Sequence, residues 1–263
     1  MGTSHPTVDA AAAAVENSPH LLPPPPFRIR RPALFLDLDG VLAPLAETPE
    51  AVVPHPRRTA ALKAVADRFD GRVAIVSGRT LAEVDRISES ALTAASGVHG
   101  LERRRPDGSV DRAEPAEGVR VAVEAFEAFA ARVPGVIVED KAVSAGLHFR
   151  QAPHAAAAAT ALARCLATDT GLVMQPGNAV IELKTPGTDK GTALTTFMQE
   201  PPFAGARPIM VGDDLTDEYG FRAAEALGGF GILVGPPRDT AARFGLSGVD
   251  EVLDWLERLE ETE

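Results

Sequence analysis

The stretch Ala33-Leu34-Phe35-Leu36-Asp37-Leu38-Asp39-Gly40 decides the fold class of this chain. Four apolar residues form a run typical of a buried strand, and two carboxylates two positions apart follow it directly. Parallel α/β sheets place their chemistry at the carboxyl ends of strands, and Gly40 lets the chain turn and bring backbone N–H groups up to an anion. We expect one carboxylate to attack and its neighbour to handle a proton. A solvated strand end is the alternative, because Asp-x-Asp recurs by chance in an acidic chain.

Three further segments place polar side chains where a strand ends or a helix begins. The apolar run 73–76 leads into Ser77, the run 208–211 leads into Asp213 and Asp214, and Lys190 lies at the start of a predicted helix. A hydroxyl or a lysine at such a position can bind an anion, and an acidic pair can bind a divalent cation. The structural alternatives are a helix N-cap for Ser77 and a solvated charge for Lys190.

Apolar periodicity alternates between strands and helices in two blocks, which favours a parallel sheet wound on both faces. The first block predicts strands at 33–38 and 72–76, helices near 57–69 and 80–89, and a short strand into Gly97. The second block predicts helices near 190–199, 215–226 and 249–259, with strands at 208–211 and 230–234. The predicted fold class is therefore α/β with a Rossmann-like core.

A different pattern separates the two blocks. It predicts a hairpin across Pro106-Asp107-Gly108, helices near 117–132 and 154–168, and strands near 136–139, 143–149, 172–175 and 179–183. Because this insertion leaves and rejoins the core near the catalytic edge, we expect a mobile cap that closes over a substrate; a rigid excursion is the alternative. The predicted organisation is an arm at 1–27, a core of 28–102 and 186–263, and a cap of 103–185.

Composition limits the classes of partner. The chain has 263 residues, of which 45% are hydrophobic, so it can bury a sizeable core. Its net charge of −11 argues against nucleic acid or an anionic membrane surface, and no apolar run approaches the roughly 20 residues that span a bilayer. The lone Cys165 has no internal disulfide partner, which fits a reducing cytoplasm.

Residues 1–27 differ in kind from the rest. They contain the alanine run Ala10–Ala14 and the proline run Pro23–Pro26 but neither Lys nor Arg, so they do not match a secretory signal. We expect a disordered or loosely docked arm, with partner docking through the proline run as the alternative.

Taken as a set, these motifs resemble those of the haloacid dehalogenase (HAD) superfamily of phosphohydrolases. Their wording is similar to that of the trehalose-6-phosphate phosphatase family over about 32–255: Leu-Asp-Leu-Asp-Gly-Val-Leu-Ala-Pro-Leu from Leu36, Ser-Gly-Arg from Ser77, Gly-Val-His-Gly-Leu-Glu from Gly97 and Gly-Asp-Asp-Leu-Thr-Asp-Glu from Gly212. The resemblance implies a HAD core with a C2-type cap and hydrolysis of trehalose 6-phosphate to trehalose and phosphate.

The resemblance also assigns roles. Asp37 would be the nucleophile that forms an aspartyl-phosphate, and Asp39 the acid and base. Ser77 and Lys190 would compensate the phosphoryl charge. The ligands of Mg²⁺ would be Asp37, the backbone carbonyl of Asp39, and Asp213, while Asp214 would bind the ion through water or orient the other ligands.

Substrate selection is expected to come largely from the cap. Glu182 and Lys184 share one face of a predicted strand, as do His148 and Arg150, and such pairs can grip sugar hydroxyls. The predicted substrate-binding set is Gly40, Arg79, His99, His148, Arg150, Glu182 and Lys184. The alternatives are an exposed polar strand face for the cap pairs, a surface ion pair for Arg79 and a structural histidine for His99. Thr185-Pro186-Gly187 departs from the family, which more often carries a basic residue there.

Other functions stay open on the sequence. They are a HAD phosphatase acting on sucrose phosphate or a phosphorylated glycosylglycerate, and a non-catalytic trehalose-sensing module associated with a synthase. The complete set of Asp37, Asp39, Ser77, Lys190 and Asp213 argues against the second. A cytoplasmic enzyme, with association with a trehalose-phosphate synthase as a further expectation, is the overall prediction.

Overall fold

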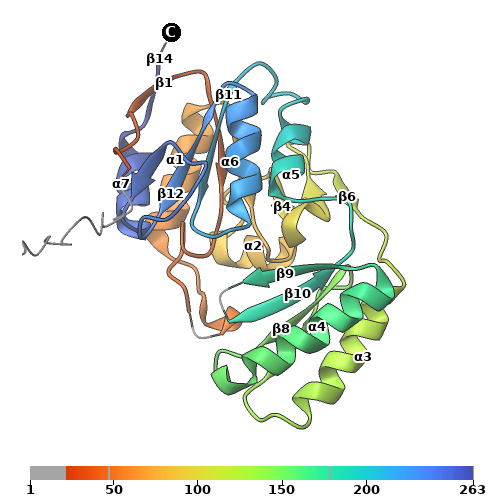
Figure 1. Cartoon of the computed structure of the whole chain (residues 1–263). Helices are drawn as coiled ribbons and strands as arrows, with labels where there is room; N and C mark the ends of the chain where they lie inside the picture. Colours follow the sequence, from red (N-terminus) through yellow and green to blue (C-terminus); the bar gives the residue numbers. More distant parts are fainter. Residues whose placement is uncertain (1–21, 47, 178, 263) are drawn as a thin grey trace, which may run out of the picture.

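The computed structural model describes residues 22–46, 48–177 and 179–262 and contains a large mixed sheet (Figure 1). Its strand order is β13-β12-β11-β2-β3-β4-β5-β6, with parallel pairing from β13 to β4 and antiparallel pairing beyond β4. The strands are β2 (Pro32–Leu36), β3 (Val73–Val76), β4 (Ala95–Gly97), β5 (Glu102–Arg104), β6 (Val110–Arg112), β11 (Arg207–Gly212), β12 (Phe230–Val234) and β13 (Phe244–Leu246). The predicted parallel α/β core is confirmed.

Alternation along β2 explains why helices cover both faces of this sheet. Leu34 and Leu36 pack in one cluster with α1 (Pro56–Arg68), α2 (Leu81–Ser88) and α7 (Val249–Arg258). Ala33 and Phe35 pack on the other face with α5 (Lys190–Phe197) and α6 (Asp217–Ala226). Every β2 residue is buried, so the strand reads as one continuous apolar run.

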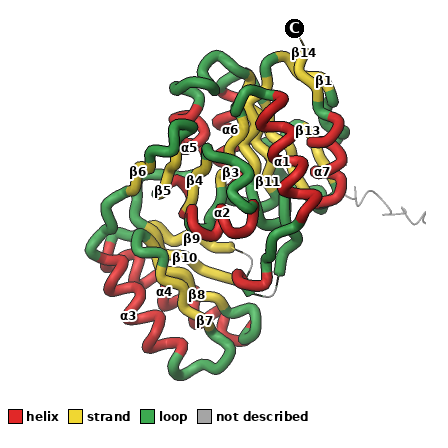
Figure 2. The backbone as a smooth tube through the Cα atoms, turned by 180° about the vertical axis from the view of Figure 1, so that it is seen from behind, coloured by secondary structure: helices red, strands yellow, loops and turns green. Residues whose placement is uncertain are grey.

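A second sheet of four antiparallel strands stands beside the first, in the order β7-β8-β10-β9. Its strands are β7 (Ile137–Asp140), β8 (Ser144–His148), β9 (Val173–Gly177) and β10 (Val180–Lys184). The helices α3 (Gly118–Ala130) and α4 (Ala156–Thr170) cover its outer face, and its other face is turned toward the large sheet (Figures 1 and 2). We call residues 118–184 the cap and the part built on the large sheet the core.

The β5–β6 hairpin corrects one detail of the sequence interpretation. We expected it to begin the insertion, but β5 pairs antiparallel with β4 and extends the large sheet. Arg103 of β5 ties the hairpin to the core through an ion pair to Glu200 (2.7 Å), and its ion pair to Asp111 (3.0 Å) joins β5 to β6. Turn residues at 106–108 predict the hairpin but not the sheet that it joins.

Short elements complete the described chain. They are β1 (Arg28–Arg30), which pairs in parallel with β14 (Glu260–Thr262), and the 3₁₀ turns η1 (Pro49–Ala51), η2 (Val98–Gly100) and η3 (Pro153–Ala155). The end of the predicted arm docks on the core, since the carbonyls of Pro23 and Pro26 accept hydrogen bonds from Gly245 N (3.0 Å) and Trp255 Nε1 (3.0 Å). The remainder of that arm, 1–21, lies outside the described residues. No helix in the described ranges has the length and apolarity to cross a bilayer.

Candidate active site

The loop after β2 places Asp37 at the carboxyl edge of the large sheet. Its backbone N–H donates to Val211 O (3.0 Å), and its Oδ1 accepts from Leu38 N (2.8 Å). Gly40 has φ +74°, and a Cβ there would lie 2.0 Å from Asp213 Oδ2. Glycine is therefore required twice, for the left-handed backbone and for the approach of the second acidic loop.

The loop after β11 brings three further carboxylates to this edge. Asp217 is fully buried, and its Oδ2 accepts from the backbone N–H groups of Asp213 (2.9 Å) and Asp214 (3.1 Å). Asp214 in turn accepts from Thr216 N (2.7 Å) and Oγ1 (2.6 Å). Asp217 was absent from the predicted site, although its position four residues after Asp213 in one acidic loop was a usable signal.

Lys190 joins the two loops. As the first residue of α5 it is buried, and its Nζ lies 2.8 Å from Asp37 Oδ2 and 2.7 Å from Asp217 Oδ1. Burial disfavours the ammonium, but the charges of Asp217, Asp37 and Asp214 outweigh it and raise the pKa of Lys190. Lys190 is therefore a permanent cation at the centre of the acidic cluster.

One lysine does not neutralise this cluster. Burial is the main reason that the pKa of Asp37 is raised well above its usual range; burial, with the charges of Asp217 and Asp214, raises that of Asp213 to about 7. Burial alone would raise the pKa of Asp214 too, but Lys190 and the Thr216 hydrogen bonds hold it below its usual value. Carboxylate oxygens of Asp37, Asp213 and Asp217 lie within 4.8 Å of one another. This hard-oxygen, electron-rich donor set fits a divalent cation such as Mg²⁺.

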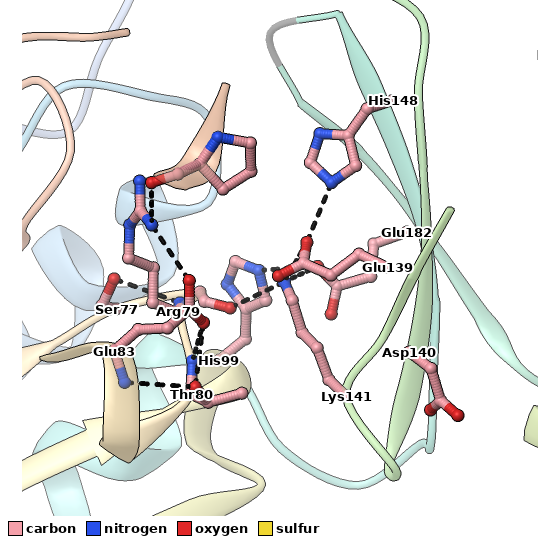
Figure 3. Close-up of polar contacts among 12 residues, drawn as sticks. Ser77, Arg79, Thr80, Glu83, His99, Glu139, Asp140, Lys141, His148 and Glu182 are labelled. Atoms are coloured by element: carbon pink, nitrogen blue, oxygen red, sulfur yellow. Dashed lines mark hydrogen bonds and ion pairs between the residues drawn. The ribbon is translucent and has the colours of Figure 1, made fainter. Parts of the chain in front are cut away.

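Ser77 and Arg79 follow β3 beside the acidic cluster. Ser77 is buried at the strand end, where Oγ accepts from Arg79 N (3.2 Å). The Arg79 guanidinium donates two hydrogen bonds to Asp39, from Nε to Oδ2 (2.7 Å) and from Nη2 to Oδ1 (2.9 Å). It also donates a hydrogen bond to Glu83 Oε1 (3.0 Å). Figure 3 shows Arg79 reaching from this loop. Arg79 thus orients Asp39, in addition to lining the site cavity.

The cap contributes a buried ionic group to the site (Figure 3). Glu182 Oε2 lies 3.1 Å from Lys141 Nζ and 3.6 Å from His99 Nε2. Burial opposes ionisation of Glu182, but Lys141 and then His99 hold its pKa well below the usual range. Burial by itself would lower the pKa of Lys141, but the charges of Glu182 and Glu139 outweigh burial and raise that pKa above its usual value. Burial lowers the pKa of His99. The Glu182–Lys141 pair is consequently charged, and Glu182 Oε1 has no hydrogen-bond partner among the described residues.

Of the other predicted cap residues, two line the cavity and one does not. His148 Nε2 lies 2.8 Å from Glu139 Oε2, and Arg150 lines the same cavity. Lys184 points elsewhere: its buried ammonium donates to Thr188 O (2.5 Å). Glu139 and Lys141 were not predicted, although their i, i+2 spacing repeats that of Glu182 and Lys184.

One cavity of about 510 Å³ joins the acidic cluster to the cap group. Of the predicted site residues, Gly40 and Lys184 do not line it; those that do are Asp37, Asp39, Ser77, Arg79, His99, His148, Arg150, Glu182, Lys190, Asp213 and Asp214. Gln175 of β9 also lines it, with Nε2 3.0 Å from each ring nitrogen of His99. The volume falls within the range of about 300–1,000 Å³ that holds small ligands.

Known proteins are similar to this chain in sequence and in fold. The sequence model of the family described as trehalose-phosphatase matches residues 35–248. The trehalose-6-phosphate phosphatase of Escherichia coli (strain K12) is 37% identical over 230 residues, 86% of each chain. Two solved structures share the fold: the Candida albicans trehalose-6-phosphate phosphatase C-terminal domain (TM-score 0.79, 21% identity, 88% of this chain and 92% of that one) and the HAD phosphatase BT1666 of Bacteroides thetaiotaomicron (TM-score 0.58, 20% identity, 94% and 97%). The expected fold, with a HAD-like core and an inserted second sheet, is confirmed. This chain belongs to the trehalose-phosphatase family.

Proposed function

We propose that this chain hydrolyses trehalose 6-phosphate to trehalose and phosphate. The observation that carries the proposal is one cavity with carboxylates and Lys190 at one end and a buried polar group of the cap at the other. The first end suits a phosphate monoester, and the second suits the hydroxyls of a sugar. The name of the Escherichia coli relative supplies the identity of the sugar.

Asp37 is the proposed nucleophile. One of its carboxylate oxygens attacks phosphorus, and the bond from phosphorus to the sugar oxygen breaks, which leaves an aspartyl-phosphate. Lys190, 2.8 Å from Asp37 Oδ2, favours the ionised carboxylate that this attack requires. Ser77 Oγ and the Lys190 ammonium bind phosphoryl oxygens and offset the charge that builds up there.

Asp39 is the proposed acid and base. It donates a proton to the departing sugar oxygen, which yields trehalose, and then removes a proton from the water that attacks the aspartyl-phosphate and releases phosphate. The two bonds from Arg79 fix the orientation of Asp39 before substrate binds.

Asp37 and the acidic loop after β11, which carries Asp213, would hold Mg²⁺. When bound, this ion neutralises phosphoryl oxygens that would otherwise repel the nucleophile. Both oxygens of Asp217 already accept hydrogen bonds from Lys190 and from backbone N–H groups. We therefore assign Asp217 the role of orienting this loop, and Asp213 that of ligand.

A phosphate-release screen tests the function. Purified protein is assayed with trehalose 6-phosphate, sucrose phosphate, a phosphorylated glycosylglycerate and a small aryl phosphate. We expect the highest kcat/KM for trehalose 6-phosphate, loss of turnover in EDTA with recovery in Mg²⁺, and no turnover by Asp37→Asn at unchanged thermal stability. A higher kcat/KM for another sugar phosphate would replace the assigned substrate. Near wild-type turnover by Asp37→Asn would contradict the covalent mechanism.

The cytoplasmic location and the association with a trehalose-phosphate synthase stay predictions. They would be checked by fractionation of cells and by co-purification with the synthase of the same organism.

A further inference from the structure

The turn that follows β4 has an unusual backbone. Val98, His99 and Gly100 have φ values of 45°, 52° and 100°. A left-handed backbone is costly for a β-branched residue such as Val98, and such outliers persist only where the surroundings impose them. Here the turn directs two successive N–H groups at the loop that carries Ser77: Val98 N donates to Arg79 O (2.9 Å) and His99 N donates to Ser77 O (3.0 Å).

The carbonyl of His99 is held from the other side. Thr188, in the segment that returns the chain from cap to core, donates its hydroxyl to His99 O (2.9 Å). Lys184, at the end of β10, donates its ammonium to Thr188 O (2.5 Å). Contact at this point is close, since a Cβ on Gly100 would lie 2.3 Å from Thr188 Oγ1. Hydrogen bonds therefore run without interruption from Lys184 through Thr188 and His99 to Ser77.

Both ends of this series lie at functional positions. Lys184 is two residues beyond Glu182 on the same strand, and Glu182 lines the cavity. The cap also contacts the Ser77 loop directly, because Lys141 Nζ donates to Gly78 O (3.0 Å). The position of β10 is thereby linked to the position of Ser77 (Figure 3 shows Ser77, His99 and Glu182).

We propose that Lys184, Thr188 and His99 are positioning residues that align Ser77 with the phosphoryl group when the cap has closed on a sugar. This inference rests on the proposed function, because it requires a substrate whose sugar is gripped at Glu182. It gives Lys184 a role other than the sugar contact expected from the sequence. A substrate without a sugar does not hold the cap closed, so the series of hydrogen bonds contributes little to its turnover.

Thr188 offers the sharpest test. Thr188→Val keeps the branched shape and removes the donor, whereas Thr188→Ser keeps the donor. Thr196→Val is the matched control. The Thr196 hydroxyl donates to Thr192 O (2.8 Å), and both of these residues lie on α5. Each variant is assayed for kcat and KM with trehalose 6-phosphate and with a small aryl phosphate, alongside its thermal midpoint.

We expect Thr188→Val to lower kcat for trehalose 6-phosphate about three- to tenfold, with KM and aryl phosphate turnover unchanged. Thr188→Ser and Thr196→Val should behave as wild type. An unchanged kcat in Thr188→Val, or an equal loss on both substrates, overturns the positioning role. If the wild-type protein prefers another sugar phosphate, the proposed function fails instead, and the same comparison of variants is made with that substrate.

Discussion

Single residues show how burial and charge compete in this site. Removing Glu182 and Lys141 from water disfavours both charged forms, yet each holds the other ionised across 3.1 Å. Replacing one partner leaves the other buried with a weaker counter-charge. The pair therefore makes stability depend on pH in a predictable direction.

Glu182→Gln tests this dependence. A carboxyl whose pKa is lowered by folding stabilises the protein above its unfolded pKa of 4.5, and this contribution is lost as the pH falls below that value. Urea denaturation should show wild type more stable than the variant by about 3 kcal/mol near neutral pH. The difference should narrow below pH 4.5. A difference that does not change with pH would mean that ionised Glu182 does not stabilise the fold.

Among the elements, α5 shows how the start of a helix positions a buried lysine. Asp189 caps it: Oδ1 accepts from Thr192 N (2.7 Å), and Asp189 N donates to Thr192 Oγ1 (2.7 Å). Lys190 is the next residue, so the cap fixes the direction in which its side chain leaves the helix. Sequence periodicity predicts this helix, and the capping box sets its first turn.

Asp189→Ala should therefore affect both stability and activity. Loss of the cap should lower the free energy of unfolding by about 1 kcal/mol. It should also lower kcat, because Lys190 is held less firmly between Asp37 and Asp217. Asp189→Asn is the control, since asparagine caps as well as aspartate. Equal effects of the two variants in denaturation and in turnover would show that the charge of Asp189, and not its cap, matters.

At the scale of the whole molecule, the cavity is formed where the two sheets face each other. Core residues supply the acidic end of the cavity, while cap residues that include Glu139, Lys141, Gln175 and Glu182 line the other end. Lys141 contributes to both parts, because its ammonium donates to Gly78 O in the core and to Glu182 in the cap. The contact between the two sheets therefore buries polar groups that need one another or a bound ligand as partners.

Lys141→Met should separate binding of the sugar from chemistry at phosphorus. The apolar stem is kept and the charge is lost, so kcat/KM for trehalose 6-phosphate should fall roughly ten- to a hundredfold. Turnover of a small aryl phosphate should change little, because that substrate has no sugar to orient. A parallel loss on both substrates would place Lys141 in the support of the core loop alone.

Local sequence determined the elements and the chemistry at their ends. The apolar run before Asp37, the runs before Ser77 and Asp213 and the start of α5 each predict a strand or helix from adjacent residues. Parallel pairing then brings those ends to one edge, so the positions of Asp37, Ser77, Lys190 and Asp213 follow from the sequence.

Tertiary structure alone decided which distant groups meet. Lys141 reaches Gly78 across 63 positions of sequence, and Gln175 reaches His99 across 76. It also decided that the β5–β6 hairpin joins the large sheet and that Lys184 turns toward Thr188 rather than into the cavity. Periodicity reports which face of an element is apolar, whereas the partner of a buried charge is chosen by how two elements pack, and no local pattern encodes that choice.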